Sequence, residues 1–481
     1  MEPGELHADV AIVGAGLAGL VAGAILARRG RRVVILEHAP AVGGRGGAVP
    51  VAEGYWLSFG ERDGHDVGDC QLPWHHGAEA AREAGVELML RPVGAPLRLH
   101  RFPEGTVLDG GRWGAEGFLA AARDFFECPP DGLDELVAVM GRLAAATPEE
   151  VDAAIPQTLG AWLPANVRHA GVRRALLLMA TVIFHPHPEE ASVGRLMRFL
   201  QAPRAGGPFI PDDPGVGGMQ GLMEPWARAV VAQGGVIALG WKPVEIIVDA
   251  GRVAGAVAVD RTSRVLEVRA PVVVCTYPAW ELQELVDARL LPAAFLETAR
   301  ALAAHRADLV GWAAGLARLP TLRSSGEPDR HAGWNRFLVG PERTYRGGYQ
   351  ITSLTSTHAA PPGRHLLELV VARFFRGGTT AGQPWTVARR EIDEAVDYLR
   401  RFYADLDACL EWSAYRYIPA PQSMSWAWAP VRRHGLELDG VAGLLLAGPT
   451  LEAPAAIVDH GAYAGLAAAR RALALGGQGT S

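Results

Sequence analysis

The stretch covering residues 9–45 constrains the fold more than any other part of the chain. It begins with Asp9-Val-Ala-Ile-Val-Gly14, a short β-branched run that is typical of a buried parallel strand. An apolar helix follows and ends at Gly30, after which Arg32-Val-Val-Ile-Leu-Glu37 reads as a second strand. This order predicts a βαβ unit near the start of the chain.

The turn between the first strand and the helix carries the pattern Gly14-x-Gly16-x-x-Gly19. In such a turn the first glycine makes the tight bend, the second lets the backbone approach a pyrophosphate, and the third lets helix pack on strand. The N–H groups at the start of the helix then face the phosphates. Glu37, at the end of the second strand, can accept hydrogen bonds from ribose hydroxyls. Together these features predict a dinucleotide site.

The next motif, Gly43-Gly44-Arg45, indicates which dinucleotide binds. With it, the chain resembles the flavin amine oxidase and phytoene desaturase superfamily, in which this arginine lies against the FAD pyrophosphate and flavin. The resemblance implies FAD as cofactor and assigns binding roles to Gly44 and Arg45. A guanidinium offers planar bidentate donors to phosphate, and adjacent glycines permit close backbone approach.

Two later segments extend the resemblance. After Gly-Gly-Met219, the run Lys242-Pro-Val-Glu is similar to the strand that places backbone groups against adenine, a role that falls to Val244. Leu-Leu-Leu-Ala-Gly448 is similar to the last FAD motif, which precedes a helix pointing its N-terminus at the flavin. Here Pro449 departs from the family pattern, because proline brings no N–H donor to the corner.

These motifs predict an α/β fold: a doubly wound, Rossmann-like FAD-binding domain of the glutathione reductase type, with a discontinuous α+β substrate domain. The FAD-binding domain is expected in three segments, at residues 1–60, 205–290 and 425–481. The substrate domain is expected in two segments, at residues 61–204 and 291–424.

Within the substrate domain, periodicity predicts both helices and strands. A helix over residues 133–146 is expected to bury one apolar face. A longer helix over residues 387–410 is expected to bury Phe402 and four other apolar residues in the core. Strands are expected at residues 349–353 and 365–375. The residues expected to be buried are Leu133, Leu136, Val137 and Met140 in the first helix, and Ile392, Ala395, Val396, Leu399 and Phe402 in the second.

Composition excludes several classes of function. The chain has 481 residues, 49% of them hydrophobic, and a net charge of −6 without a basic cluster, so no nucleic-acid partner is expected. Its four cysteines form no CxxC pair, which fits a cytoplasmic protein without a zinc site. In His185-Pro-His187-Pro the prolines prevent a shared helix face, so no metal site is predicted there.

The resemblance implies an FAD-dependent oxidoreductase of the desaturase or isomerase type, acting on an apolar polyene or isoprenoid, with oxygen or a quinone as electron acceptor. A flavin amine oxidase is the alternative, and a non-catalytic prenyl- or lipid-binding protein of the same fold is the second. Amine oxidases hold a lysine near the flavin on a substrate-domain strand. The one lysine of this chain, Lys242, lies instead in the FAD-binding segment, which favours the first function.

The substrate pocket is harder to assign. Trp426 and Trp428 lie just upstream of the last FAD segment and are expected to wall an apolar pocket, unless they pack the domain interface. Gly60 falls where the family places a glycine beneath the flavin ring. Three polar residues after it could reach the ring: Glu61, His65 and Asp66. No catalytic acid or base can be named among them. An apolar substrate also makes peripheral membrane contact possible; the oligomeric state stays open.

Overall fold

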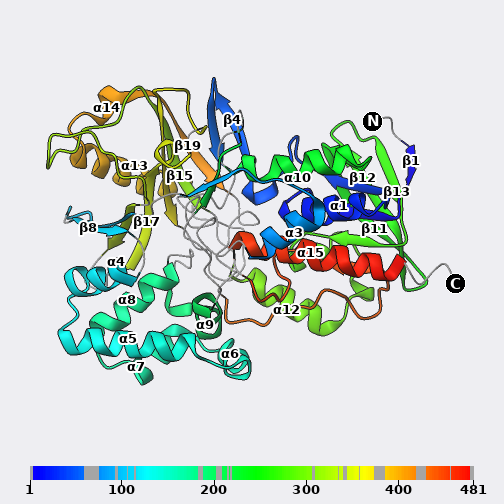
Figure 1. Ribbon diagram of the computed structural model, residues 1–481, viewed down its shortest axis with the longest axis horizontal. Coiled ribbons are helices and arrows are strands. Elements are labelled where there is room, and N and C mark those ends of the chain that lie inside the picture. The colour runs from blue at the N-terminus through cyan, green and yellow to red at the C-terminus, as the bar shows by residue number, and fades with distance from the viewer. Residues whose placement is uncertain are drawn as a thin grey trace.

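The structure is a computed structural model, shown in Figure 1. It describes residues 4–58, 75–92, 96–105, 107–112, 115–181, 188–201, 209–213, 216, 219–305, 309–333, 335–339, 344–356, 358–372, 385–418, 429–455 and 457–476.

A parallel sheet of five strands forms the centre of one half of the molecule, here called the parallel-sheet unit. Its β2 and β3 are short, wholly buried runs of Val, Ile and Leu, as a sheet covered on both faces requires. The strands, in spatial order, are β10 (Val236–Leu239), β3 (Val33–Glu37), β2 (Val10–Val13), β14 (Val273–Cys275) and β20 (Leu444–Leu446).

Helices cover one face of this sheet and a second sheet covers the other. Helix α1 (Leu17–Arg28) is buried along almost its whole length because it packs between α10 (Gln220–Ala232) and α15 (Ile457–Gly476), with α3 (His75–Ala84) beside α15. On the opposite face lies a four-stranded sheet whose apolar residues share a core with the parallel strands. Its strands, in spatial order, are β1 (Gly4–His7), β13 (Val265–Arg269), β12 (Arg252–Asp260) and β11 (Trp241–Asp249).

A sheet of seven strands forms the other half, here called the seven-stranded unit. All its neighbouring strands are antiparallel except β16 and β7, which run parallel. The strands, in spatial order, are β19 (Leu410–Ile418), β15 (Leu309–Leu316), β18 (His365–Ala372), β17 (Thr344–Ile351), β16 (Asn335–Val339), β7 (Pro96–Phe102) and β8 (Val107–Arg112).

The two faces of this sheet have different surroundings. Helix α13 (Trp385–Phe402) packs on the face that carries Trp312, Tyr349 and Leu369, which we call the outer face. The inner face carries the alternate residues, including the register-paired Gln350 and Glu368, and turns toward the parallel-sheet unit in Figure 1.

Further elements complete the two halves. A helical group shares a separate core beside the seven-stranded sheet. It comprises α4 (Ala115–Ala120), a π-helical turn (Ala121–Phe125), α5 (Pro130–Ala144), α6 (Pro148–Ala154), α7 (Leu159–Asn166), α8 (Ala170–Thr181) and α9 (Val193–Gln201). The remaining short elements are the strands β4 (Ala48–Ala52), β5 (Tyr55–Ser58), β6 (Leu90–Pro92) and β9 (Phe209–Pro211), and the helices α11 (Ala279–Leu282), α12 (Ala293–Ala303) and α14 (Leu406–Cys409).

The α/β class and the parallel sheet are confirmed. All described strands of the two sheets in the parallel-sheet unit come from the three segments predicted to form the FAD-binding domain, although the domain limits themselves stay predictions. Three expectations are wrong. Val137 is 58% exposed, and Leu136, Val139 and Leu143 form the buried face of α5 instead.

The helix predicted over residues 387–410 is also wrong in length. α13 ends at Phe402, because the backbone then pairs with residues 321–323: the Ala404 N–H donates to the Thr321 carbonyl, and the Phe402 carbonyl accepts from the Arg323 N–H. The chain continues into α14 and then β19. The strand predicted to reach Ser353 ends at Ile351, after which a short 3₁₀ turn begins. Within the described residues, no helix combines the length and apolar composition needed to cross a membrane.

Candidate dinucleotide site

The glycine loop after β2 is held by backbone packing that admits no side chain at two of its positions. Gly14 has φ of +100°, and a Cβ there would lie 2.3 Å from Thr276 Oγ1. A Cβ at Gly19 would lie 2.0 Å from the Gly14 carbonyl oxygen, so Gly19 permits the close contact between α1 and β2. These two glycines therefore have the structural roles that the motif predicts.

The second glycine turn lies against the first. Gly43 forms an isolated parallel β-bridge with Gly16, and the Gly43 N–H donates to the Ala15 carbonyl at 2.9 Å. Gly44 has φ of +55°, and a Cβ there would come within 3.1 Å of the Gly16 Cα. The two turns thus meet backbone to backbone, and this contact brings Arg45 to the glycine loop.

Glu37 supports the same loop from the end of β3. Its carboxylate is 3% exposed, and it accepts hydrogen bonds from the Ala15 N–H at 2.7 Å and the Ala39 N–H at 2.8 Å. His38 Nδ1 lies 2.9 Å from the same group. Burial raises the pKa of Glu37, but the hydrogen bonds from His38, Ala39 and Ala15 outweigh it and hold the pKa below its usual value. Glu37 is therefore ionised, and it orients the glycine loop, a role that the motif alone did not reveal.

Two helix N-termini point toward this region. Gly16 caps α1 without any side-chain hydrogen bond, and the first turn holds no acid, so its N–H groups are open to an anion. At the start of α15, His460 Nε2 lies 2.9 Å from the Leu451 carbonyl. Burial first, then the charge of Arg433, lowers the pKa of His460 to about 3, which keeps this histidine neutral.

A cavity of about 550 Å³ lies between these elements. Seven of the eight residues predicted to bind the cofactor line it, whereas Gly19 lies behind the loop. Pro449 and Lys242 also line it, together with residues after β14 such as Thr276 and Tyr277 that the sequence analysis missed. Their position at the carboxyl end of a parallel strand next to β2 was the available signal. The seven predicted residues are Gly14, Gly16, Glu37, Gly44, Arg45, Val244 and Gly448.

The corner after Gly448 is built around a partly buried charge, Glu452, whose side chain is 30% exposed. Glu452 accepts two hydrogen bonds from Arg195, at 2.6 and 3.0 Å, and a further one from Arg198 of the same helix, α9. Burial raises the pKa of Glu452, but the Arg195 hydrogen bonds and the charges of Arg195, Arg433 and Arg198 outweigh it and lower the pKa to about 2. Glu452 thus ties the loop after β20 to the helical group.

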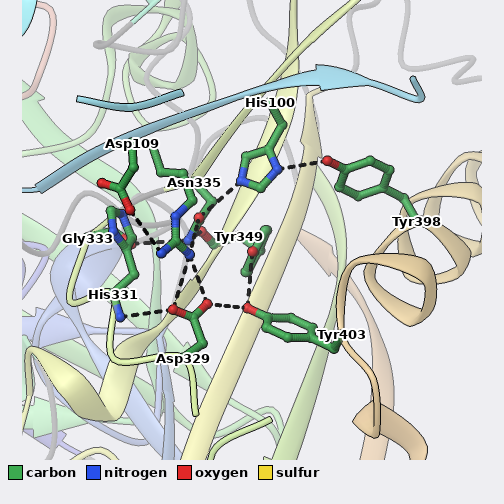
Figure 2. Close-up of polar contacts among 10 residues, drawn as sticks. His100, Asp109, Asp329, His331, Gly333, Asn335, Tyr349, Tyr398 and Tyr403 are labelled. Carbon is green, nitrogen blue, oxygen red and sulfur yellow. Dashed lines mark hydrogen bonds and ion pairs between the residues drawn. The ribbon is translucent and has the colours of Figure 1, made fainter. Parts of the chain in front are cut away.

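A second polar network lies under α13 on the outer face (Figure 2). Arg98 donates to Asp329 at 2.9 Å, and the Tyr403 hydroxyl donates to the same carboxylate at 2.7 Å. His100 lies 3.1 Å from the Asn335 amide oxygen and 2.8 Å from the Tyr398 hydroxyl. Burial lowers the pKa of His100 to about 3, so the ring is neutral, donating to the amide and accepting from the tyrosine.

This outer network joins β7, β16, the loop at residue 329 and the end of α13. Its charged pair is buried and supported by neutral hydrogen bonds. We interpret it as structural.

Several predicted positions lie outside the described residues. They are Gly60, Glu61, His65, Asp66, His185, His187, Trp426 and Trp428. In the part of the chain that the structure does describe, no group of three or more His, Cys, Asp or Glu residues gathers at metal-binding distances.

Comparison with known proteins supports this geometry in two steps. A family model for an NAD(P)-binding Rossmann-like domain matches residues 12–66, which contain the glycine loop, Glu37 and Arg45. The parallel-sheet unit is therefore a Rossmann-like dinucleotide-binding fold. Comparison with curated protein sequences gives no match.

Solved structures extend the likeness to the whole chain. An oxidoreductase from Methanosarcina mazei is 17% identical with a TM-score of 0.67, over 95% of this chain and 99% of that one. A putrescine oxidase with bound putrescine is 15% identical with a TM-score of 0.63, over 98% and 99%. Cyclohexylamine oxidase from Brevibacterium oxydans is 17% identical with a TM-score of 0.60, over 97% and 99%. The chain has the fold of the flavin amine oxidases, which confirms the resemblance at the level of fold.

Proposed function

We propose that this protein is an FAD-dependent oxidoreductase. The observation that carries the proposal is the cavity that the glycine loop, Glu37, Arg45, Val244 and the start of α15 line together. A dinucleotide needs a backbone cradle for its pyrophosphate, an acceptor for ribose and a slot for adenine, and these residues supply all three around one space.

The residues fit FAD in a definite order. The N–H groups at the start of α1 and the Arg45 guanidinium would hold the pyrophosphate, Glu37 would accept from a ribose hydroxyl, and Val244 would border the adenine. The N-terminus of α15 would stabilise negative charge at the flavin end. Bound flavin would supply the redox chemistry by accepting a hydride equivalent from the substrate. The protein would bind the substrate and exclude water.

For the substrate we infer an apolar polyene or isoprenoid, with oxygen or a quinone as the terminal acceptor. One observation supports this inference. The one lysine of the chain, Lys242, lines the dinucleotide cavity from β11 and is absent from the seven-stranded sheet. The strands of that sheet, as far as the structure describes them, therefore carry no lysine that could lie near the flavin, where amine oxidases of this fold hold theirs. The fold itself is shared with putrescine and cyclohexylamine oxidases, so an amine oxidase is the second candidate.

Anaerobic flavin bleaching separates the two functions. Protein reconstituted with FAD is mixed without oxygen with primary and secondary amines in one series, and with polyenes, isoprenoids and retinoids in another. Bleaching by the second series alone supports the proposal. Bleaching by amines alone would replace it with the amine oxidase function. Failure to bind FAD at all would favour the non-catalytic, lipid-binding alternative.

A further inference from the structure

The inner face of the seven-stranded sheet carries a polar network of its own. Glu368, which is fully buried, accepts from Arg416 at 2.7 Å and from the Thr352 hydroxyl at 2.8 Å. Gln350, register-paired with Glu368 on the next strand, donates its amide N–H to the Thr355 hydroxyl oxygen at 2.8 Å. The network therefore spans β17, β18 and β19 and the turn that follows β17.

The amide oxygen of Gln350 has no hydrogen-bond donor among the described residues. The orientation of this amide follows from its neighbours. The Thr355 hydroxyl donates to the Thr352 carbonyl at 2.9 Å, so its oxygen must accept from the Gln350 nitrogen. The oxygen of the amide is thus the end left without a partner, in a side chain that is 0% exposed. A buried acceptor in this state is unfavourable by about 1–3 kcal/mol until a donor reaches it.

The charges around this acceptor are balanced. Glu368 is paired with Arg416, and Arg91, which donates to the Thr355 carbonyl, lies 3.4 Å from Asp212. Both arginines of the described network are matched by carboxylates, so this network offers no net negative charge to an ammonium group. The chemistry of the position is therefore that of a neutral acceptor, which suits a hydroxyl donor.

The inner face also faces the cofactor side of the molecule. Trp412, on the inner face of β19, contacts the Tyr55 ring edge to face at 5.3 Å between ring centroids. Tyr55 begins β5, which follows the Gly43–Arg45 turn and its strand β4 along the chain. The inner face thus carries both Gln350 and the tryptophan that contacts β5, the strand pair next along the chain from the Gly43–Arg45 turn.

We propose that the Gln350 amide oxygen accepts a hydrogen bond from a hydroxyl group of the substrate, so that the apolar substrate carries one alcohol end. This inference rests on the proposed function and names the polar contact of that same site. Gln350 is then a specificity-determining residue: a substrate without the hydroxyl would leave its acceptor unpaired in a buried position.

Matched ligand pairs test the proposal by binding rather than turnover. Farnesol, geranylgeraniol and retinol are each compared with their methyl ethers, which keep the chain and lose the O–H donor. Dissociation constants are measured by calorimetry on the FAD-loaded protein. We expect at least one alcohol to bind roughly 5- to 150-fold more tightly than its ether.

The Gln350→Met variant should erase this preference with FAD content and melting temperature unchanged. Thr355→Ser is the matched control, because it keeps the hydroxyl that fixes the orientation of the Gln350 amide; its alcohol preference should persist. If the wild-type protein binds the alcohol and the ether equally in every ligand pair, the proposal is overturned. This test does not depend on any variant. Stronger binding of farnesylamine than of farnesol would overturn it too, in favour of an ammonium site. Failure of FAD to bind would refute the proposed function instead.

Discussion

Replacing Gly16 by valine tests the dinucleotide site with the least disturbance of the fold. Gly16 has φ of −73° and ψ of 178°, an extended conformation that any residue adopts. Apart from its chain neighbours, the nearest atom of the described residues to a Cβ at this position would be the Gly44 Cα, at 3.9 Å. Because Gly16 lines the cavity, the added side chain would project into the space that the pyrophosphate needs.

The expected loss of affinity follows from the contacts that the side chain would displace. If valine moves the pyrophosphate off two backbone N–H groups, each hydrogen bond to a charged group contributes about 1.5 kcal/mol or more. The sum of about 3 kcal/mol corresponds to an increase in Kd on the order of 100-fold. Deflavinated protein titrated with FAD in a calorimeter measures this change directly, and the purified variant should be colourless.

Gly19→Ala provides the contrast. Its Cβ would lie 2.0 Å from the Gly14 carbonyl oxygen, so the apoprotein itself should melt at a lower temperature. The Gly16→Val apoprotein should melt like the wild type. A Gly16→Val protein that binds FAD with wild-type affinity would refute the assignment of this loop to the phosphates. Equal destabilisation of the two apoproteins would show that Gly16 is needed for folding rather than for binding.

Two further predictions concern neighbouring parts of the site. Pro449 lines the cavity and offers no N–H, so Pro449→Asp should tighten FAD binding by about 1 kcal/mol, measured by equilibrium dialysis; unchanged or weaker binding would mean that the corner has another geometry. Trp426→Ala and Trp428→Ala should weaken binding of an apolar ligand such as retinol and leave FAD content intact, as fluorescence titration would report. Loss of FAD or of folding would assign these tryptophans to the domain interface.

The dinucleotide site could be predicted because its signals are local. The glycines, the apolar helix and Glu37 lie within one βαβ unit, and each position has a backbone role that few residue types can fill. The structure adds what the motif could not state: Glu37 itself holds the loop through the Ala15 N–H. That contact depends on the turn geometry, which leaves no separate mark in the sequence.

The seven-stranded unit was harder to predict because its order is not local. The end of α13 carries no glycine or proline signal, and the helix stops at Phe402 because the backbone there pairs with residues 321–323, far away in the chain. The inner-face network joins Gln350, Glu368 and Arg416 from three strands that meet only in the folded sheet. Periodicity identifies the strands as apolar runs and gives no reason to expect a buried carboxylate on one of them.

Acid lability at Glu452 follows from the sign of its pKa shift. The folded-state pKa of about 2 lies below the ordinary value of 4.5, so the carboxylate contributes stability above pH 4.5 and loses that contribution as the pH falls toward 2. The difference corresponds to about 3 kcal/mol at neutral pH. Glu452→Gln should therefore lower the melting temperature at pH 7, because Arg195, 6% exposed, loses the carboxylate that it contacts.

The comparison with the wild type across pH gives the sharper test. The gap in melting temperature between wild type and Glu452→Gln should close as the pH falls from 4.5 toward 2, since the unfolded wild-type chain then takes up a proton at Glu452 while the folded chain does so only near pH 2. Glu437→Gln is the control: its ion pair with Arg471 is exposed, so the substitution should change the melting temperature little at any pH. A gap for Glu452→Gln that stays constant from pH 7 to pH 3 would contradict the assignment, because the effect would then come from packing of the loop after β20 and not from the charge of Glu452.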